Sequence, residues 1–108
     1  MFLLHLAIAL FIITTAMGIY LSSCVFLEKP RPAAVILIHG IFSIIGFSIL
    51  VLQYHETLTS IGLLLAGTVF GVCLLYQDIT SVPFTKWFCI AHGILSIAGC
   101  VLLLKFAI

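Results

Sequence analysis

The sequence predicts an all-α integral membrane protein that folds as an up-down four-helix bundle. First, 65% of its 108 residues are hydrophobic and only 6% are charged, whereas soluble domains carry about 25% charged residues. Second, four apolar stretches are each long enough to cross a bilayer, which takes ~20 residues. Third, the second half of the chain repeats the first at a fixed offset. Together these features indicate a duplicated helical hairpin with lipid as its main solvent.

Short polar connections separate the four apolar stretches. The predicted spanning helices are Phe2–Ser22, Ala33–Tyr54, Leu58–Tyr76 and Trp87–Phe106. Prolines at positions 30, 32 and 83 fall where the second and fourth helices should begin. Short connections force neighbouring helices to be antiparallel, so a 1-2-3-4 ring places the second and fourth helices diagonally. The whole chain, residues 1–108, is then a single transmembrane domain.

The charges predict an orientation in the membrane. Lys29, Arg31 and Lys86 lie at one end of the predicted bundle, and only Lys105 lies at the other. The positive-inside rule then places both termini on the non-cytoplasmic side, and we expect a bacterial inner membrane. Membrane lipid is the expected surrounding partner. The net charge of +1 gives no basic field, so no nucleic acid is expected as a partner.

The internal repeat pairs residues 1–53 with residues 54–106. The segment from His39 to Gly46 (HGIFSIIG) matches the segment from His92 to Gly99 (HGILSIAG). The positions that stay identical include His39, Ser43, Gly46 and Leu50, whose counterparts are His92, Ser96, Gly99 and Leu103. Their spacing of four, seven and eleven residues puts them on one helical face. We expect this face to point inward and to present one histidine from each diagonal helix.

Two glycines lie at the depth of these histidines. His39 is ~9 Å into its helix, at ~1.5 Å per residue, and Gly18 lies at nearly the same level of the first helix. Gly71 bears the same relation to His92. Opposed imidazoles with side-chain-free backbone between them are what a b-type heme with two axial histidines needs. Ser43 and Ser96, one turn away with Gly46 and Gly99 beyond, complete the predicted cofactor-binding face.

This arrangement resembles the heme-binding core of small membrane b-type cytochromes, including the cytochrome b561-like four-helix electron carriers. The resemblance is architectural and spans the whole chain. It implies a heme b whose iron is bound by His39 and His92, and single-electron transfer. Quinone, superoxide, ferric iron or a protein partner is then the redox counterpart. Any enzyme activity would be that of an oxidoreductase acting at the heme edge, because no acid–base or nucleophile set is visible.

A second pair of histidines lies at the opposite membrane side. Cytochromes of this kind usually carry two hemes, and His5 and His55 are the candidate ligands for a second one. They belong to neighbouring rather than diagonal helices, and neither has a histidine at its repeat position. We therefore prefer to interpret them as histidines at helix ends in the interface. His5 remains a candidate ligand in a homodimer, since bundles this small often associate.

Three alternatives to heme remain open. Cys89 and His92, three residues apart, with Cys73 at a similar depth, form a set that suits copper or zinc. A small transporter or channel with histidines in a proton relay is the second alternative. The third is that His39 and His92 only hydrogen-bond across an interface of small residues, as polar groups in membrane bundles do.

Overall fold

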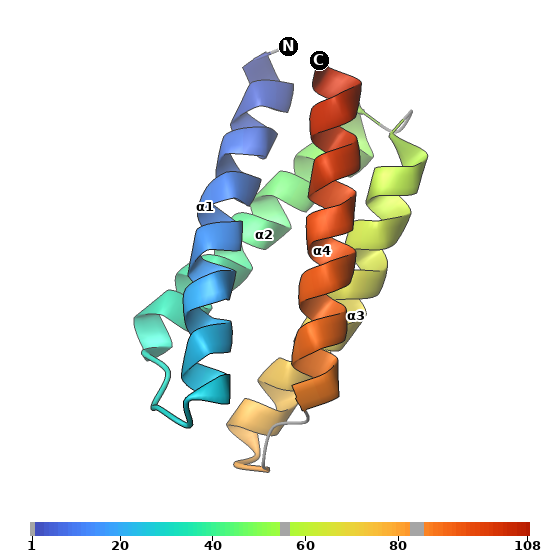
Figure 1. The fold of residues 1–108 in the computed structure, drawn as a ribbon. Helices are drawn as coiled ribbons and strands as arrows, with labels where there is room; N and C mark the ends of the chain where they lie inside the picture. Colours follow the sequence, from blue (N-terminus) through green and yellow to red (C-terminus); the bar gives the residue numbers. More distant parts are fainter. Residues whose placement is uncertain (1, 55–56, 83–85) are drawn as a thin grey trace.

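The computed structural model contains four α-helices, and it describes residues 2–54, 57–82 and 86–108. The helices are α1 (Phe2–Phe26), α2 (Ala33–Gln53), α3 (Leu58–Ile79) and α4 (Lys86–Ala107). They run up and down in turn, so that both termini lie at one end of the bundle (Figure 1). The predicted all-α four-helix architecture is therefore confirmed.

Each helix is long and apolar enough to cross a membrane. The molecule measures 40 Å along its longest axis, which compares with about 40–45 Å for a bilayer that includes its headgroups. Large apolar side chains such as Ile12, Ile44, Val72 and Ile94 are exposed on its outside. A monomeric soluble protein does not expose apolar surface on this scale, so these features indicate an integral membrane protein.

The first and third helices run past the apolar stretches that predict them. α1 continues to Phe26 rather than Ser22, and α3 continues to Ile79 rather than Tyr76. At the end of α1 the amide of Lys29 donates to the Cys24 carbonyl, and the amide of Glu28 donates to the Val25 carbonyl. This is a Schellman ending, whose turn residue takes a left-handed conformation. Glu28 has that conformation, with φ 55°.

The end of α3 repeats this turn. The amide of Val82 donates to the Gln77 carbonyl, and the amide of Ser81 donates to the Asp78 carbonyl. Ser81 has φ 58° and stands 53 residues after Glu28. The helix that follows each turn begins at an equivalent residue as well, Ala33 or Lys86. The sequence offset is thus reproduced in backbone geometry.

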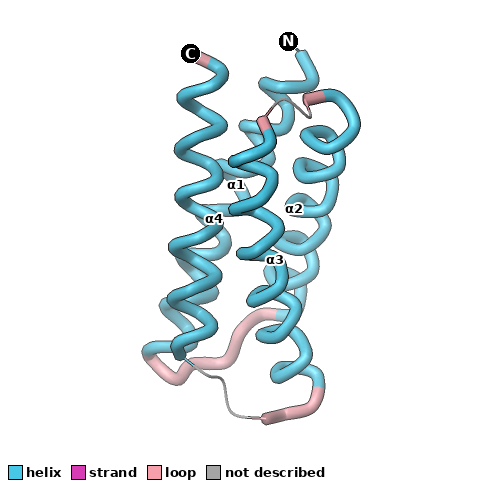
Figure 2. Tube along the Cα trace, turned by 90° about the vertical axis from the view of Figure 1, so that its right-hand side faces the viewer, coloured by secondary structure: helices cyan, strands magenta, loops and turns pink. Residues whose placement is uncertain are grey.

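The four helices pack as two hairpins. α3 packs most extensively against α4, and α1 packs nearly as extensively against α2; the α1–α4 seam is smaller, and α2 barely touches α3. Within the described ranges, the α2 and α4 backbones do not contact each other. They are the predicted diagonal pair, and Figure 2 shows α4 and α2 on opposite sides of the bundle.

The apolar core lies toward the end of the bundle that holds the termini. Leu4, Leu50 and Leu103 are almost fully buried there. Leu50 and Leu103 are equivalent in the two halves, and both belong to the face that was predicted to point inward. The Tyr54 hydroxyl accepts a hydrogen bond of 3.1 Å from the Leu4 amide, which satisfies a backbone donor at the start of α1. The histidines lie nearer the other end of the bundle.

Two glycines of the inward face receive a bulky side chain from the neighbouring helix. A Cβ on Gly46 would lie 3.1 Å from the Phe11 ring, and one on Gly99 would lie 2.8 Å from Leu64. Phe11 and Leu64 are themselves 53 residues apart. Gly46 and Gly99 therefore serve close packing within each hairpin, two turns away from the histidines along α2 and α4.

Candidate functional site

The two histidines of the repeat lie next to each other across the width of the bundle, nearer the end opposite the termini. The ring centres of His39 on α2 and His92 on α4 are 6.1 Å apart, and the ring planes make an angle of 74°. Both residues are partly buried. Since the α2 and α4 backbones are not in contact, the two imidazoles bridge the diagonal of the bundle.

A backbone carbonyl of the adjacent helix orients each imidazole. His39 Nδ1 lies 3.0 Å from the Thr14 carbonyl oxygen, and His92 Nδ1 lies 2.7 Å from the Gly67 carbonyl oxygen. A carbonyl only accepts, so Nδ1 carries the proton in a neutral imidazole and Nε2 keeps its lone pair. A metal-binding histidine commonly has this arrangement, in which the outer bond fixes both the tautomer and the ring.

Gly18 and Gly71 lie directly against these rings. A Cβ on Gly18 would be 3.1 Å from Cε1 of His39, and one on Gly71 would be 2.9 Å from Cε1 of His92. Each glycine thus belongs to the same hairpin as the imidazole it touches. Its missing side chain gives the ring room to lie against the neighbouring helix, a role that the sequence analysis did not assign.

The two serines have different surroundings. Ser43 donates a 2.7 Å hydrogen bond to the His39 carbonyl one turn earlier in α2. Ser96 lies against α3, where a Cβ on Gly67 would come within 2.6 Å of its hydroxyl oxygen. Ser43 therefore bonds to a carbonyl of its own helix.

The spacing of the rings fits two imidazoles that share one metal ion. With a metal–nitrogen bond of about 2.1 Å on each side, the ring centres would be about 6.4 Å apart. The observed 6.1 Å is within a few tenths of an ångström of that value. The distance between the ring centres is therefore compatible with two imidazoles that share one metal ion. The Thr14 hydroxyl, one helical turn from Gly18, is buried and has no hydrogen-bond partner among the residues that the structure describes.

A zinc site would need more protein ligands than the described residues bring together. Structural zinc sites use four protein ligands and catalytic ones three. Across the described ranges, no group of three or more His, Cys, Asp or Glu side chains is placed to hold a metal ion. The thiol of Cys89 instead donates to the Ser22 hydroxyl at 3.4 Å.

Of the second pair of histidines, only His5 belongs to the residues that the structure describes. His5 is exposed on the first turns of α1. His55 lies outside the described residues.

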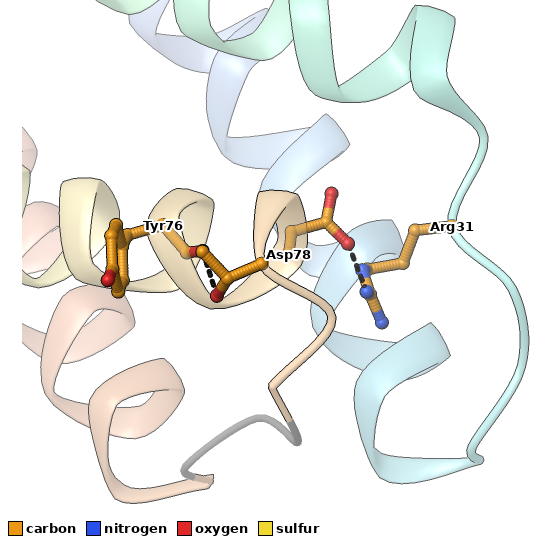
Figure 3. A network of polar contacts seen from close by, with 4 residues as sticks. Arg31, Tyr76 and Asp78 are labelled. Atoms are coloured by element: carbon orange, nitrogen blue, oxygen red, sulfur yellow. Dashed lines mark hydrogen bonds and ion pairs between the residues drawn. The ribbon is translucent and has the colours of Figure 1, made fainter.

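The described carboxylates lie at the ends of helices or in turns. Asp78, in the last turn of α3, forms an ion pair with Arg31, which precedes α2 (Figure 3).

Sequence reasoning did not find the carbonyls of Thr14 and Gly67. They are equivalent positions of the repeat, yet their side chains differ, so no identity marks them. The contribution of each comes from the backbone, which the side chain does not reveal.

The fold and the site define a class: a bundle of membrane-length helices with two facing histidines at its centre. No family model, curated protein or solved structure matches the chain. The function must therefore be argued from the site itself.

Proposed function

We propose that the protein is a membrane-embedded b-type cytochrome that transfers single electrons through one heme b, with His39 and His92 as axial ligands. The observation that carries the proposal is the pair of imidazoles, 6.1 Å apart, with Nδ1 of each held by a carbonyl. Such an arrangement leaves both Nε2 atoms as lone-pair donors. In the described part of the chain, no hydrogen bond involves either Nε2.

The chain's own residues would act by positioning. His39 and His92 would hold the heme iron, and ligation by two histidines would favour electron transfer over binding of oxygen or substrate at iron. The Thr14 and Gly67 carbonyls would raise the basicity of the two ligands and hold their orientation. Gly18 and Gly71 would keep the ligands seated against α1 and α3. Bound heme supplies the one-electron chemistry, with quinone, superoxide, ferric iron or a protein as counterpart.

We also propose that the bundle arose by duplication of a helical hairpin and spans a bacterial inner membrane. Contacts that recur at an offset of 53 residues support the duplication: Gly18–His39 with Gly71–His92, and Phe11–Gly46 with Leu64–Gly99. The basic residues Lys29, Arg31 and Lys86 lie at the end opposite the termini. By the positive-inside rule that end faces the cytoplasm.

An optical spectrum tests the heme proposal directly. We expect protein purified in detergent from heme-replete cells to show sharp reduced bands of low-spin heme. His39→Ala and His92→Ala should each abolish heme retention while far-UV circular dichroism stays helical. His5→Ala tests the second pair: an unchanged spectrum is expected for one heme bound by His39 and His92, whereas partial loss of heme would make the exposed His5 a ligand of a second heme.

Two results would contradict the proposal. A colourless preparation of the unaltered protein would favour histidines that only pack against each other. Heme that is retained in both His39→Ala and His92→Ala would show that it binds at a different site. Metal analysis of a colourless sample would then test the copper or zinc alternative.

A further inference from the structure

A basic cavity opens at the end of the bundle opposite the termini. Its volume is about 380 Å³. The residues that line it come from the end of α1, the turn that follows and the start of α4; they include Cys24, Val25, Glu28, Lys29, Arg31 and Lys86. This cavity is separate from the histidine pair, which lies about two turns deeper in the helices.

The charges around the basic cavity favour an anion. Arg31 is offset by its ion pair with Asp78, and Glu28 offsets one further positive charge. Lys29 and Lys86 together still leave the cavity with a net positive charge. The Lys86 ammonium lies 5.8 Å from the centre of the Phe26 ring, a cation–π contact that holds its side chain at the end of α1.

Helix ends of both polarities lie at this end of the bundle, because α2 and α4 begin here while α1 and α3 end here. α4 begins at Lys86, a residue of the cavity wall, and α2 begins at Ala33, two residues beyond Arg31. Pro32 precedes α2 and makes no side-chain capping bond. The first amides of a helix carry partial positive charge and bind phosphate readily. Since the helix ends offset one another, the net attraction for an anion at this end comes from Lys29 and Lys86.

The surroundings indicate where the phosphate would come from. Cys24 and Val25 give the cavity an apolar side, and Glu28, Lys29 and Lys86 give it a charged one. That change from apolar to charged occurs at the helix ends, where the headgroups of a bilayer lie if the helices span it. An anionic phospholipid presents its phosphate at this depth, with acyl chains alongside the exposed apolar helix surfaces.

We propose that the basic cavity binds the phosphate of an anionic phospholipid, with Lys29 and Lys86 as its charged contacts. The inference rests on the proposed membrane insertion and is independent of heme. Its probe is phosphatidylglycerol, compared with phosphatidylcholine of the same acyl chains. Phosphatidylcholine carries the same phosphate beside a quaternary ammonium, which the lysines repel.

Native mass spectrometry of the detergent-purified protein measures this binding. It counts lipid adducts and registers heme by its own mass, so loss of lipid and loss of heme are read separately. We expect phosphatidylglycerol to bind about tenfold more tightly than phosphatidylcholine. Lys29→Gln and Lys86→Gln should each weaken it about fivefold, the effect of one basic residue near an anionic lipid surface. Glu28→Gln should strengthen it.

Lys105→Gln is the matched control, because it removes one positive charge at the far end of the bundle and should leave binding unchanged. Equal affinity for the two lipids, or an equal loss in Lys105→Gln and Lys86→Gln, would overturn the proposal. If inorganic phosphate forms adducts at millimolar concentration and displaces the lipid, the cavity binds free phosphate, and the assignment of the ligand to a phospholipid is overturned. If circular dichroism shows that a lysine variant does not fold, the tighter lipid binding expected for Glu28→Gln still tests the proposal.

Discussion

Replacing Gly71 with alanine tests how closely the His92 ring is seated against α3. The new Cβ would be 2.9 Å from Cε1 and 3.1 Å from Nδ1 of His92. Real Cβ atoms essentially never lie closer than 3.0 Å to a neighbour, so the imidazole must move. That movement would strain or break the 2.7 Å bond from Nδ1 to the Gly67 carbonyl, whose net worth is about 0.5–1.5 kcal/mol.

The matched control is Gly93→Ala. Gly93 follows His92 directly, and a Cβ there would meet nothing within 4 Å. Both substitutions gain the same helix propensity, so the difference between the two variants isolates the clash. Overpacking of this kind costs about 1–3 kcal/mol, and we expect Gly71→Ala to be less stable than Gly93→Ala by that amount.

The assay is reversible unfolding in mixed micelles, followed by circular dichroism, together with the optical spectrum. We expect Gly71→Ala to unfold earlier and to lose heme, and Gly93→Ala to match or exceed the unaltered protein in both respects. Gly18→Ala should behave like a milder Gly71→Ala, because its Cβ would be 3.1 Å from the His39 ring. Equal stability of Gly71→Ala and Gly93→Ala would refute the close approach itself.

Three further predictions concern stability and use the same unfolding assay. Gly99→Ala should destabilise the protein by about 1–3 kcal/mol. In a double-mutant cycle, this substitution should cost less in a protein that already carries Leu64→Ala; additive effects would contradict the contact between Gly99 and Leu64. Arg31→Gln and Asp78→Asn should show a coupling of about 0.2–1 kcal/mol, because both side chains are partly exposed; zero coupling would mean that the pair adds nothing. Glu28→Gly should stabilise by about 1 kcal/mol, since only glycine adopts a left-handed φ without steric cost; a loss of stability would show that the Glu28 side chain has a favourable contact.

The sequence was sufficient to predict the number of helices and their ring order. Composition and the length of each apolar stretch determine the number of helices, and the short connections determine their order around the ring. The helix ends were less predictable. α1 ends at Phe26 because its last carbonyls are satisfied by the turn at Glu28, and a search for apolar residues stops at Ser22 instead.

The sequence also did not predict that the pairs of neighbouring helices pack to different extents. A ring of four helices gives each helix two neighbours but does not say how tightly each pair packs. Gly18, Gly46, Gly71 and Gly99 each receive a side chain from their hairpin partner, so the hairpins α1–α2 and α3–α4 close tightly. The seam between α2 and α3 is left as the loosest one.

The residues that differ between the two halves help to explain what the proposed duplication has kept. Phe11 and Leu64 differ, yet each fills the space beside a glycine, so the requirement is for a small residue opposite a large one. Thr14 and Gly67 also differ, yet each supplies a carbonyl to a histidine, and any residue has a carbonyl. Identity is retained at His39 and His92, whose Nδ1 atoms these carbonyls hold, and at Gly18 and Gly71, where a Cβ would meet the rings. Identity is also retained at the core pair Leu50 and Leu103, so the case for a ligand role of the histidines depends on how their rings are placed, with each Nδ1 held by a carbonyl and the two ring centres 6.1 Å apart.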